Sequence, residues 1–232
     1  DQFFEALTNE ENLYSYYYNG KIVKTKINYN YIEIIKDLDL SKIIDKNNIE
    51  SSTTNNVQKL QDIIFAGKMN GNGMELSHIT ITAQNDKVKY SSFGLFKQIG
   101  SVDTYDSYGN VYNNKLGDDG LTVIKNIKLS IDSMTATITK SVGTLSGEVI
   151  NSKLYNIDVY SNNGVVVTGN NIVGGIAGRI SGNSYVKGVS SNLSVKATME
   201  NRSHEELYQT SSVKRVYKNA FDILEDDFND NV

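Results

Sequence analysis

A short box of apolar residues and glycines occurs three times in this chain, and it limits the folds that the chain can adopt. The copies read FGLFKQI over 93–99, VGTLSGEV over 142–149 and VGGIAGRI over 173–180. Each copy has one aliphatic residue at its centre and one at its end: Leu95 and Ile99, Leu145 and Val149, Ile176 and Ile180. A repeat of this size usually forms one supersecondary unit that stacks on its own copies.

A second motif, Asn or His followed by apolar, polar and apolar residues, accompanies the box. Its four copies begin at His78, Asn126, Asn156 and Asn192. The apolar residues that follow lie at 79, 127, 157 and 193, so the successive steps are 48, 30 and 36 residues. If about 18 residues between 99 and 124 form an inserted loop, the first step also becomes about 30. The spacing therefore predicts coils of about 30 residues each.

These spacings predict an all-β fold, a right-handed parallel β-helix (solenoid) of about four coils with helical terminal segments. Asn126, Asn156 and Asn192 would stack at one corner, with their amides hydrogen-bonded along the axis. Gly71 and Gly73 suit positive φ at a tight turn. The glycines of the boxes are predicted to form the corners between strands: Gly94, Gly143, Gly147, Gly174, Gly175 and Gly178.

The pattern divides the chain into three regions. Residues 1–61 are expected to form an N-terminal segment and cap, with a hairpin turn at Asn19-Gly20. Residues 62–200 would form the β-helix, with an inserted loop at 101–120. Residues 201–232 are predicted to contain a helix that caps the last coil or links to a further domain, because apolar residues recur there at helical spacing. The chain begins at Asp1 without a signal peptide, so we expect it to be a piece of a longer protein.

Composition excludes several functional classes. The net charge of -4 argues against a nucleic-acid partner, which needs a basic face. No run of 18 apolar residues is present, so no membrane span is expected. The chain has no cysteine, which excludes disulfides, a thiol nucleophile and thiolate metal ligands.

Three segments together resemble a known bacterial repeat. They are Phe65–Ile81, which reads F-x-G-x-x-x-G-N-G followed by I-x-I, then Gly94–Ile99 and Val173–Ile180. Residues 62–198 resemble the GLUG surface repeat, and also the β-helical N-terminal region of immunoglobulin A-type zinc metalloproteases and of adhesins. Lys97 and Thr144 depart from the pattern at positions that are usually glycine. The resemblance implies a β-helical part of a secreted or cell-surface protein, and it implies no catalytic residue because the family's protease chemistry lies in another domain.

Catalytic motifs are nearly absent from the sequence. His204-Glu205 begins the H-E-x-x-H zinc signature, but Tyr208 stands where the second histidine is needed. The chain has only two histidines, so a histidine-rich zinc site is excluded, and His78 is assigned a packing or corner role. Asp132, Glu148 and Asp158 fall at different coil positions, which argues against a carbohydrate-cleaving pair of carboxylates.

The inserted loop 101–120 is the best candidate for binding. Its tyrosines and carboxylates suit an adaptable recognition surface or, through oxygen ligands, a Ca²⁺ ion. The alternative is a solvated loop whose tyrosines fold onto the flank of the solenoid. The candidate residues are Tyr105, Tyr108, Tyr112, Asp103 and Asp106. Otherwise no cofactor or metal is expected.

The sequence therefore favours a non-catalytic module of a large secreted or cell-surface bacterial protein, which presents a surface to a host protein or glycan. Further domains of the same chain would be the other partners. Two alternatives stay open. One is a carbohydrate-active enzyme, a polysaccharide lyase or glycosidase, and the other is a structural spacer.

Overall fold

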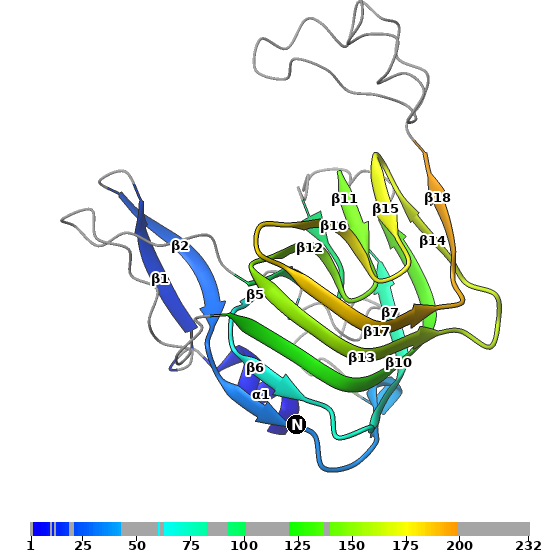
Figure 1. Ribbon diagram of the computed structural model, residues 1–232, viewed down its shortest axis with the longest axis horizontal. Helices are drawn as coiled ribbons and strands as arrows, with labels where there is room; N and C mark the ends of the chain where they lie inside the picture. The colour runs from blue at the N-terminus through cyan, green and yellow to red at the C-terminus, as the bar shows by residue number, and fades with distance from the viewer. Residues whose placement is uncertain are drawn as a thin grey trace, which may run out of the picture. The chain divides into compact units, whose positions relative to one another are not determined.

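Strands dominate the part of the chain that the computed structural model describes (Figure 1). The described residues are 2–9, 11, 13–18, 21–42, 60, 63–82, 92–100, 121–136 and 140–198. They lie within one unit, Asp1–Thr198. The predicted all-β class is confirmed, with parallel sheets and one short α-helix, α1 (Gln2–Thr8).

The strands of the described residues belong to three sheets. Sheet A has the order β1-β2-β5-β9-β12-β16, with bounds Leu13–Tyr18, Lys21–Asn28, Ile63–Phe65, Phe96–Ile99, Ser146–Ile150 and Ala177–Ser181. Sheet C has the order β15-β11-β8, with bounds Ile172–Gly174, Ser141–Gly143 and Ser92–Phe93. Sheet B comprises β3 Tyr31–Glu33, β4 Leu38–Asp39, β6 Lys68–Asn70, β7 Glu75–Thr82, β10 Thr122–Ala136, β13 Ser152–Tyr160, β14 Val166–Gly169, β17 Tyr185–Ser191 and β18 Ser194–Ala197. A 3-10 turn, Leu40–Lys42, follows β4.

The chain visits the sheets in a repeating order, C then A then B. This order holds for β8-β9-β10, for β11-β12-β13-β14 and for β15-β16-β17-β18. The β1–β2 hairpin, predicted from Asn19-Gly20, is antiparallel. The other pairings are parallel. They are β2–β5, β5–β9, β9–β12 and β12–β16 in sheet A, β8–β11 and β11–β15 in sheet C, and β3–β6, β4–β7, β6–β10, β7–β10, β10–β13, β10–β14, β13–β17 and β14–β18 in sheet B. Successive visits therefore lay one strand beside its predecessor in the same direction.

The alignment of the boxes agrees with the predicted one. Phe96 pairs with Ser146, and Ser146 pairs with Ala177. The residues directly before them, Leu95, Leu145 and Ile176, therefore occupy equivalent positions in successive layers. At the ends of the boxes, Ile99 pairs with Val149, a step of 50 residues, whereas Val149 pairs with Ile180, a step of 31. The longer step contains residues 101–120, as the inserted-loop interpretation requires.

Both ends of this insertion are held by the same short stretch of chain. The Gly100 amide donates to the carbonyl of Phe65 at 2.8 Å, and the Val123 amide donates to the carbonyl of Gly67 at 3.2 Å. The chain therefore leaves the sheets and re-enters them against two carbonyls that lie two residues apart.

The predicted alignment of the Asn/His motifs is right for two copies and wrong for the other two. Asn126 and Asn156 occupy equivalent positions, because the residues on either side of them pair in register. Gly188, and not Asn192, takes the next equivalent position. Asn192 lies at a later corner, where its side chain bonds both backbone groups of Ser161. The motif favoured Asn192 because Leu193-Ser194-Val195 keeps the apolar–polar–apolar run, whereas Val189-Ser190-Ser191 after Gly188 does not.

His78 also departs from the predicted ladder. Ile79 pairs with Ile131 rather than with Ile127, because Glu75 already pairs with Lys128 and Leu76 with Leu129 earlier in the same strands. This register places His78 beside Asp132.

The amide ladder nevertheless exists in a shorter form. Asn156 Nδ2 donates to Asn126 Oδ1 at 3.0 Å, and Asn126 Nδ2 donates to Asn70 Oδ1 at 3.2 Å. Asn126 and Asn156 have φ of 56° and 49°, and Gly188 has φ of 65°. Asparagine tolerates this left-handed region better than other residues with a side chain. The ladder thus combines a backbone bend with a row of amide contacts.

We expect Asn156→Ala to lower the free energy of unfolding by about 1.5–3 kcal/mol, since it loses a hydrogen bond and keeps positive φ. Asn156→Gly keeps the backbone conformation and should lose only about 0.5–1.5 kcal/mol. Urea unfolding of both variants measures the difference. Equal losses would contradict a role for positive φ at this position.

The glycines of the boxes are needed for close approach rather than for positive φ. Gly94, Gly143, Gly174 and Gly175 lie at or next to the short bends between strands, but Gly147 and Gly178 lie inside β12 and β16, which contradicts their assignment to corners. A Cβ atom on Gly147 would collide with the backbone nitrogen of Phe93. The sequence pattern therefore identified positions that require glycine, but the reason at Gly147 and Gly178 is the close packing of neighbouring strands and not a corner.

The apolar core runs through successive layers, and among the described residues its last layer has no strand stacked beyond it. Leu95 and Leu145 are fully buried and Ile176 is only half-buried. The closing residues behave alike, since Ile99 and Val149 are buried but Ile180 is 49% exposed. Among the described residues, β15, β16, β17 and β18 are the last strands of their rows. Exposure of apolar side chains in this layer therefore follows from its place at the end.

Parallel pairing starts earlier in the chain than the predicted boundary at residue 61. β2 pairs with β5, β3 with β6 and β4 with β7, so residues 26–39 form a layer of their own. Helix α1 packs on the core through Phe4 and Leu7. The sequence signal was weak here because this layer contains no copy of the glycine box.

Candidate functional site

The predicted binding loop lies outside the described residues. Tyr105, Tyr108, Tyr112, Asp103 and Asp106 all fall within 101–120, which the structure does not describe. Among the residues that it does describe, no group of three or more His, Asp or Glu side chains could hold a metal ion. The loop's suitability for Ca²⁺ stays a prediction.

The outer face of sheet B instead brings together lysines and tyrosines that sequence reasoning had not connected. Two adjacent rows cross the strands β6, β10, β13 and β17. The first row is Lys68, Val123, Lys153 and Tyr185, and the second is Asn70, Lys125, Tyr155 and Lys187. We call the six residues Lys68, Lys125, Lys153, Lys187, Tyr155 and Tyr185 the Lys–Tyr face.

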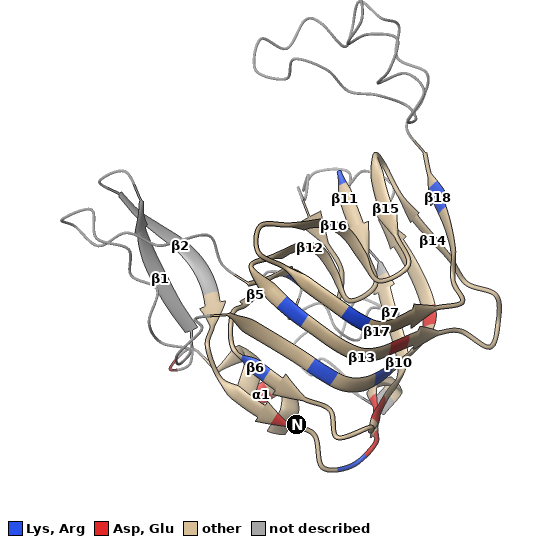
Figure 2. Cartoon of the chain, in the orientation of Figure 1, with Lys and Arg blue, Asp and Glu red and all other residues tan. Residues whose placement is uncertain are grey.

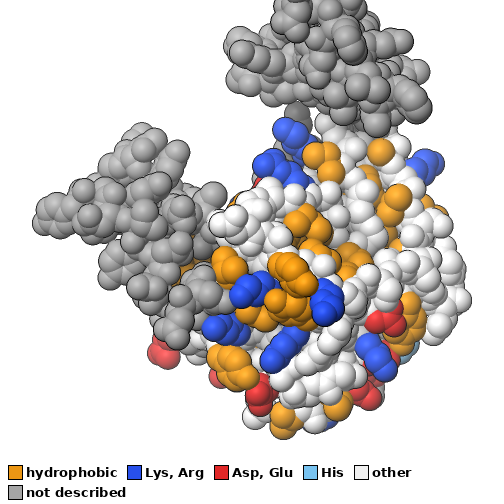
Figure 3. All heavy atoms as spheres, viewed as in Figure 1, with side chains coloured by type: hydrophobic (Ala, Val, Ile, Leu, Met, Phe, Trp, Pro, Cys, Tyr) orange, Lys and Arg blue, Asp and Glu red, His pale blue; other side chains and the backbone are white. Residues whose placement is uncertain are grey.

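These side chains lie on the outer face because strand residues alternate in direction. Met69, Ile124 and Leu154, which lie between the two rows, are buried in the core. Figure 2 shows lysines on β6, β10, β13 and β17, and Figure 3 shows blue and orange side chains together on this surface. The rings of Tyr155 and Tyr185 have centroids 5.5 Å apart and planes inclined by 47°.

The Asn ladder separates this basic region from an acidic one on the same sheet. Beyond Asn126 and Asn156, the equivalent row reads Glu75, Lys128, Asp158 and Ser190. Burial, together with a hydrogen bond to Glu75, raises the pKa of Tyr160 in this acidic region. The two halves of the sheet therefore present opposite charge to solvent.

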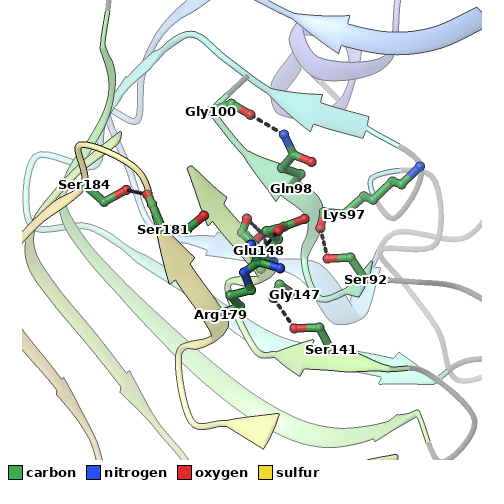
Figure 4. Close-up of polar contacts among 11 residues, drawn as sticks. Ser92, Lys97, Gln98, Gly100, Ser141, Gly147, Glu148, Arg179, Ser181 and Ser184 are labelled. Atoms are coloured by element: carbon green, nitrogen blue, oxygen red, sulfur yellow. Dashed lines mark hydrogen bonds and ion pairs between the residues drawn. The ribbon is translucent and has the colours of Figure 1, made fainter. Parts of the chain in front are cut away.

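Each of the three carboxylates considered as catalytic candidates has a separate partner. Glu148, on sheet A, lies 3.6 Å from Arg179 (Figure 4). Asp158 accepts a hydrogen bond from Ser190 at 2.7 Å, and Asp132 contacts His78 at 3.0 Å. Because they are distributed over two sheets and three partners, these carboxylates do not form the facing pair that glycoside cleavage requires.

Two buried serines near the Glu148–Arg179 pair have a structural role. Ser92 Oγ donates to the carbonyl of Lys97 at 2.6 Å, and Ser141 Oγ donates to the carbonyl of Gly147 at 2.7 Å (Figure 4). The two bonds are equivalent in successive layers, and each joins a strand of sheet C to the following strand of sheet A. The hydroxyls of Ser92 and Ser141 therefore stabilise the bend between sheet C and sheet A.

A cleft of about 1000 Å³ lies between helix α1 and residues 31–40. Its carboxylates include Asp37, which accepts from the Glu75 amide at 2.9 Å, and Asp39, which accepts from the Ser41 amide at 3.0 Å. Both side chains hold the backbone of the first layers. The cleft thus lacks a convergent set of reactive groups.

The His78–Asp132 pair is exposed and predicts a measurable pH effect. The hydrogen bond to Asp132 raises the pKa of His78 above 6.5, and the charges of Asp132, Asp39 and Glu75 add to the rise. The pair therefore stabilises the fold fully below pH 6.5, and its contribution is lost as pH rises through the folded-state pKa.

We expect the ring resonances of His78 to titrate above pH 6.5 in an NMR experiment, and Asp132→Asn to lower that midpoint. His78→Gln identifies the signals against those of His204. A midpoint for His78 that is unchanged by Asp132→Asn would show that the hydrogen bond does not control the titration.

Among the described residues, no helix is long and apolar enough to cross a membrane. The Lys–Tyr face, in which Tyr185 and Lys187 are exposed and the other four residues are half-buried, is the candidate binding surface. Comparison of the chain with protein-family models, with curated proteins and with solved structures found no match.

Proposed function

We propose that the chain is a non-catalytic recognition module of a large secreted or cell-surface bacterial protein, in which a right-handed parallel β-helix presents a binding surface. The observation that carries this proposal is the Lys–Tyr face, whose two rows continue in register over four parallel strands. A rigid sheet holds the backbone positions of these residues at fixed spacing, so a partner binds without reordering the backbone.

The β-helix itself is supported by the repeating order of the sheets. A chain that passes through sheets C, A and B in turn, and returns each time beside its previous strand, follows a coil. Crossovers between parallel strands are right-handed in nearly all proteins, which supports the handedness.

The proposed partners are a host surface protein or a glycan. The similarity of Phe65–Ile81 and of the boxes to the GLUG repeat supports a secreted or surface location, in a metalloprotease N-terminal region or an adhesin. The loop 101–120 would be a second binding element. A polysaccharide lyase or glycosidase is less well supported, because Asp132, Glu148 and Asp158 are each paired elsewhere.

The experiment incubates the full chain with immobilised acidic and neutral polysaccharides and with extracellular-matrix proteins, and it measures both retention and newly formed saccharide ends. We expect retention on at least one surface without cleavage. Formation of new saccharide ends that is lost in Glu148→Gln or Asp158→Asn would favour the enzyme. Absence of retention on every surface would favour the structural spacer.

A further inference from the structure

We infer that the Lys–Tyr face binds an acidic polysaccharide whose charge falls on alternate sugars, with the polymer lying across the strands. This inference rests on the proposed recognition function and specifies its ligand class. It depends on three features of the face: the spacing of its lysines, the position of its tyrosines and the acidic region beside it.

The lysines alternate with uncharged residues along both rows. In the first row, Lys68 and Lys153 are separated by Val123, and in the second, Lys125 and Lys187 are separated by Tyr155. Neighbouring strands lie about 4.8 Å apart, so lysines of one row are about 10 Å apart. This is a spaced array of positive charges, and a sparsely charged polymer matches it better than a dense one.

The two tyrosines supply apolar surface between the charges. Tyr155 lies between Lys125 and Lys187 in its row, and Tyr185 follows Lys153 in the other. Tyr185 is 51% exposed, and its ring contacts that of Tyr155. Tyrosine combines a flat apolar ring with a polar tip. A sugar ring can pack its C–H groups on such a surface while its carboxylate reaches a lysine.

The acidic region limits the direction of the polymer. A chain running along the strands would soon pass Asn126 and meet the row of Glu75, Lys128 and Asp158, in which two carboxylates flank one lysine and leave a net negative charge. A chain running across the strands stays over the lysines for about 14 Å between β6 and β17. The crossing direction is therefore favoured by charge.

Nucleic acid fits this face less well. The whole chain has a net charge of -4, so a densely charged polymer would be repelled by the rest of the surface. The rings of Tyr155 and Tyr185 are inclined by 47°, so two consecutive bases could not lie flat on both rings and also stay stacked on each other. A polysaccharide with fewer charges than nucleic acid is repelled less strongly by the rest of the surface.

The test measures binding of the full chain to immobilised hyaluronan, which carries a carboxylate on alternate sugars, with neutral dextran and single-stranded DNA as comparisons. We expect binding to hyaluronan that weakens with added salt, and weaker binding to both comparisons. Lys125→Gln/Lys153→Gln should lower the affinity about tenfold. The charge-matched control is Lys97→Gln/Lys196→Gln, whose two lysines lie outside the Lys–Tyr face. This control should change the affinity for hyaluronan by less than about twofold.

A second pair of variants separates the ring from the hydroxyl. Tyr155→Ala should weaken hyaluronan binding about fivefold, and Tyr155→Phe should leave it within about twofold, because the ring provides the contact. Circular dichroism and thermal unfolding establish that each variant is folded, and Tyr155→Phe keeps the test valid if Tyr155→Ala unfolds.

Three results would overturn the inference. They are equal binding to dextran, tighter binding to DNA, and hyaluronan binding that the Lys125→Gln/Lys153→Gln variant retains in full. In the last case the recognition function stands and only its location on the Lys–Tyr face fails. If the chain binds neither hyaluronan nor any surface of the wider panel, the recognition function fails with it.

Discussion

Replacing Phe65 by alanine is expected to lower the free energy of unfolding by about 3–5 kcal/mol, the largest effect of any single truncation that we propose. Phe65 is fully buried in β5, and its ring stacks on that of Phe96 with centroids 5.3 Å apart. The substitution removes the apolar contacts of the ring and leaves a cavity between two layers. Because the sheets restrain both layers, the site can collapse only partly.

Urea unfolding measures this loss, and Ile35→Ala is the control. Ile35 is 81% exposed, so its truncation should change stability by no more than about 0.5 kcal/mol. A double-mutant cycle with Phe96→Ala should give a coupling of about 0.5–1.5 kcal/mol for the ring pair. If Phe65→Ala costs no more than Ile35→Ala, the assignment of Phe65 to the core is wrong.

The second large effect is expected at Gly100, where Gly100→Ala should cost about 2–5 kcal/mol. Gly100 has φ of 80°, and a Cβ atom there would collide with the carbonyl oxygen of Ile150 and with Ser152 Oγ. Backbone atoms of a central layer cannot move aside easily. Alanine therefore combines an unfavourable φ with a steric clash.

Gly73 provides a closely matched control, because its φ is 79° and a Cβ atom there would meet nothing within 4 Å. Gly73→Ala should cost only the conformational part, about 1–2 kcal/mol. The difference between the two variants in urea unfolding isolates the clash. Equal costs would mean that the layers at Gly100 can separate enough to admit a methyl group.

The parts of the fold that sequence reasoning predicted are those with an uninterrupted repeat. The boxes that end at Ile99, Val149 and Ile180 align as expected, since aliphatic residues at equal spacing have equivalent places in successive layers. The motif at His78 was misaligned, because Glu75 already pairs with Lys128, so His78 lies several residues beyond the equivalent of Asn126. Gly188 replaced the expected asparagine because both residues tolerate positive φ.

The candidate site could not be predicted in the same way. Lys68, Lys125, Lys153 and Lys187 are separated by 57, 28 and 34 residues, so no local motif connects them. Only the register between strands shows that they share a face. Tracing the lysines through a correct alignment of the strands β6, β10, β13 and β17 would have been the available signal. The error in the Asn/His alignment obscured it.

The two hydrogen bonds that hold Gly100 and Val123 against neighbouring carbonyls make the segment between them a natural point for accepting foreign sequence. Loop-closure entropy grows slowly, so doubling the length of a flexible segment whose ends are fixed costs only about 0.6 kcal/mol. A peptide or small domain grafted there would leave the pairing of Ile99 with Val149 unchanged. Homologous chains are therefore expected to differ most in length at this point, while the rows on the sheets keep their spacing.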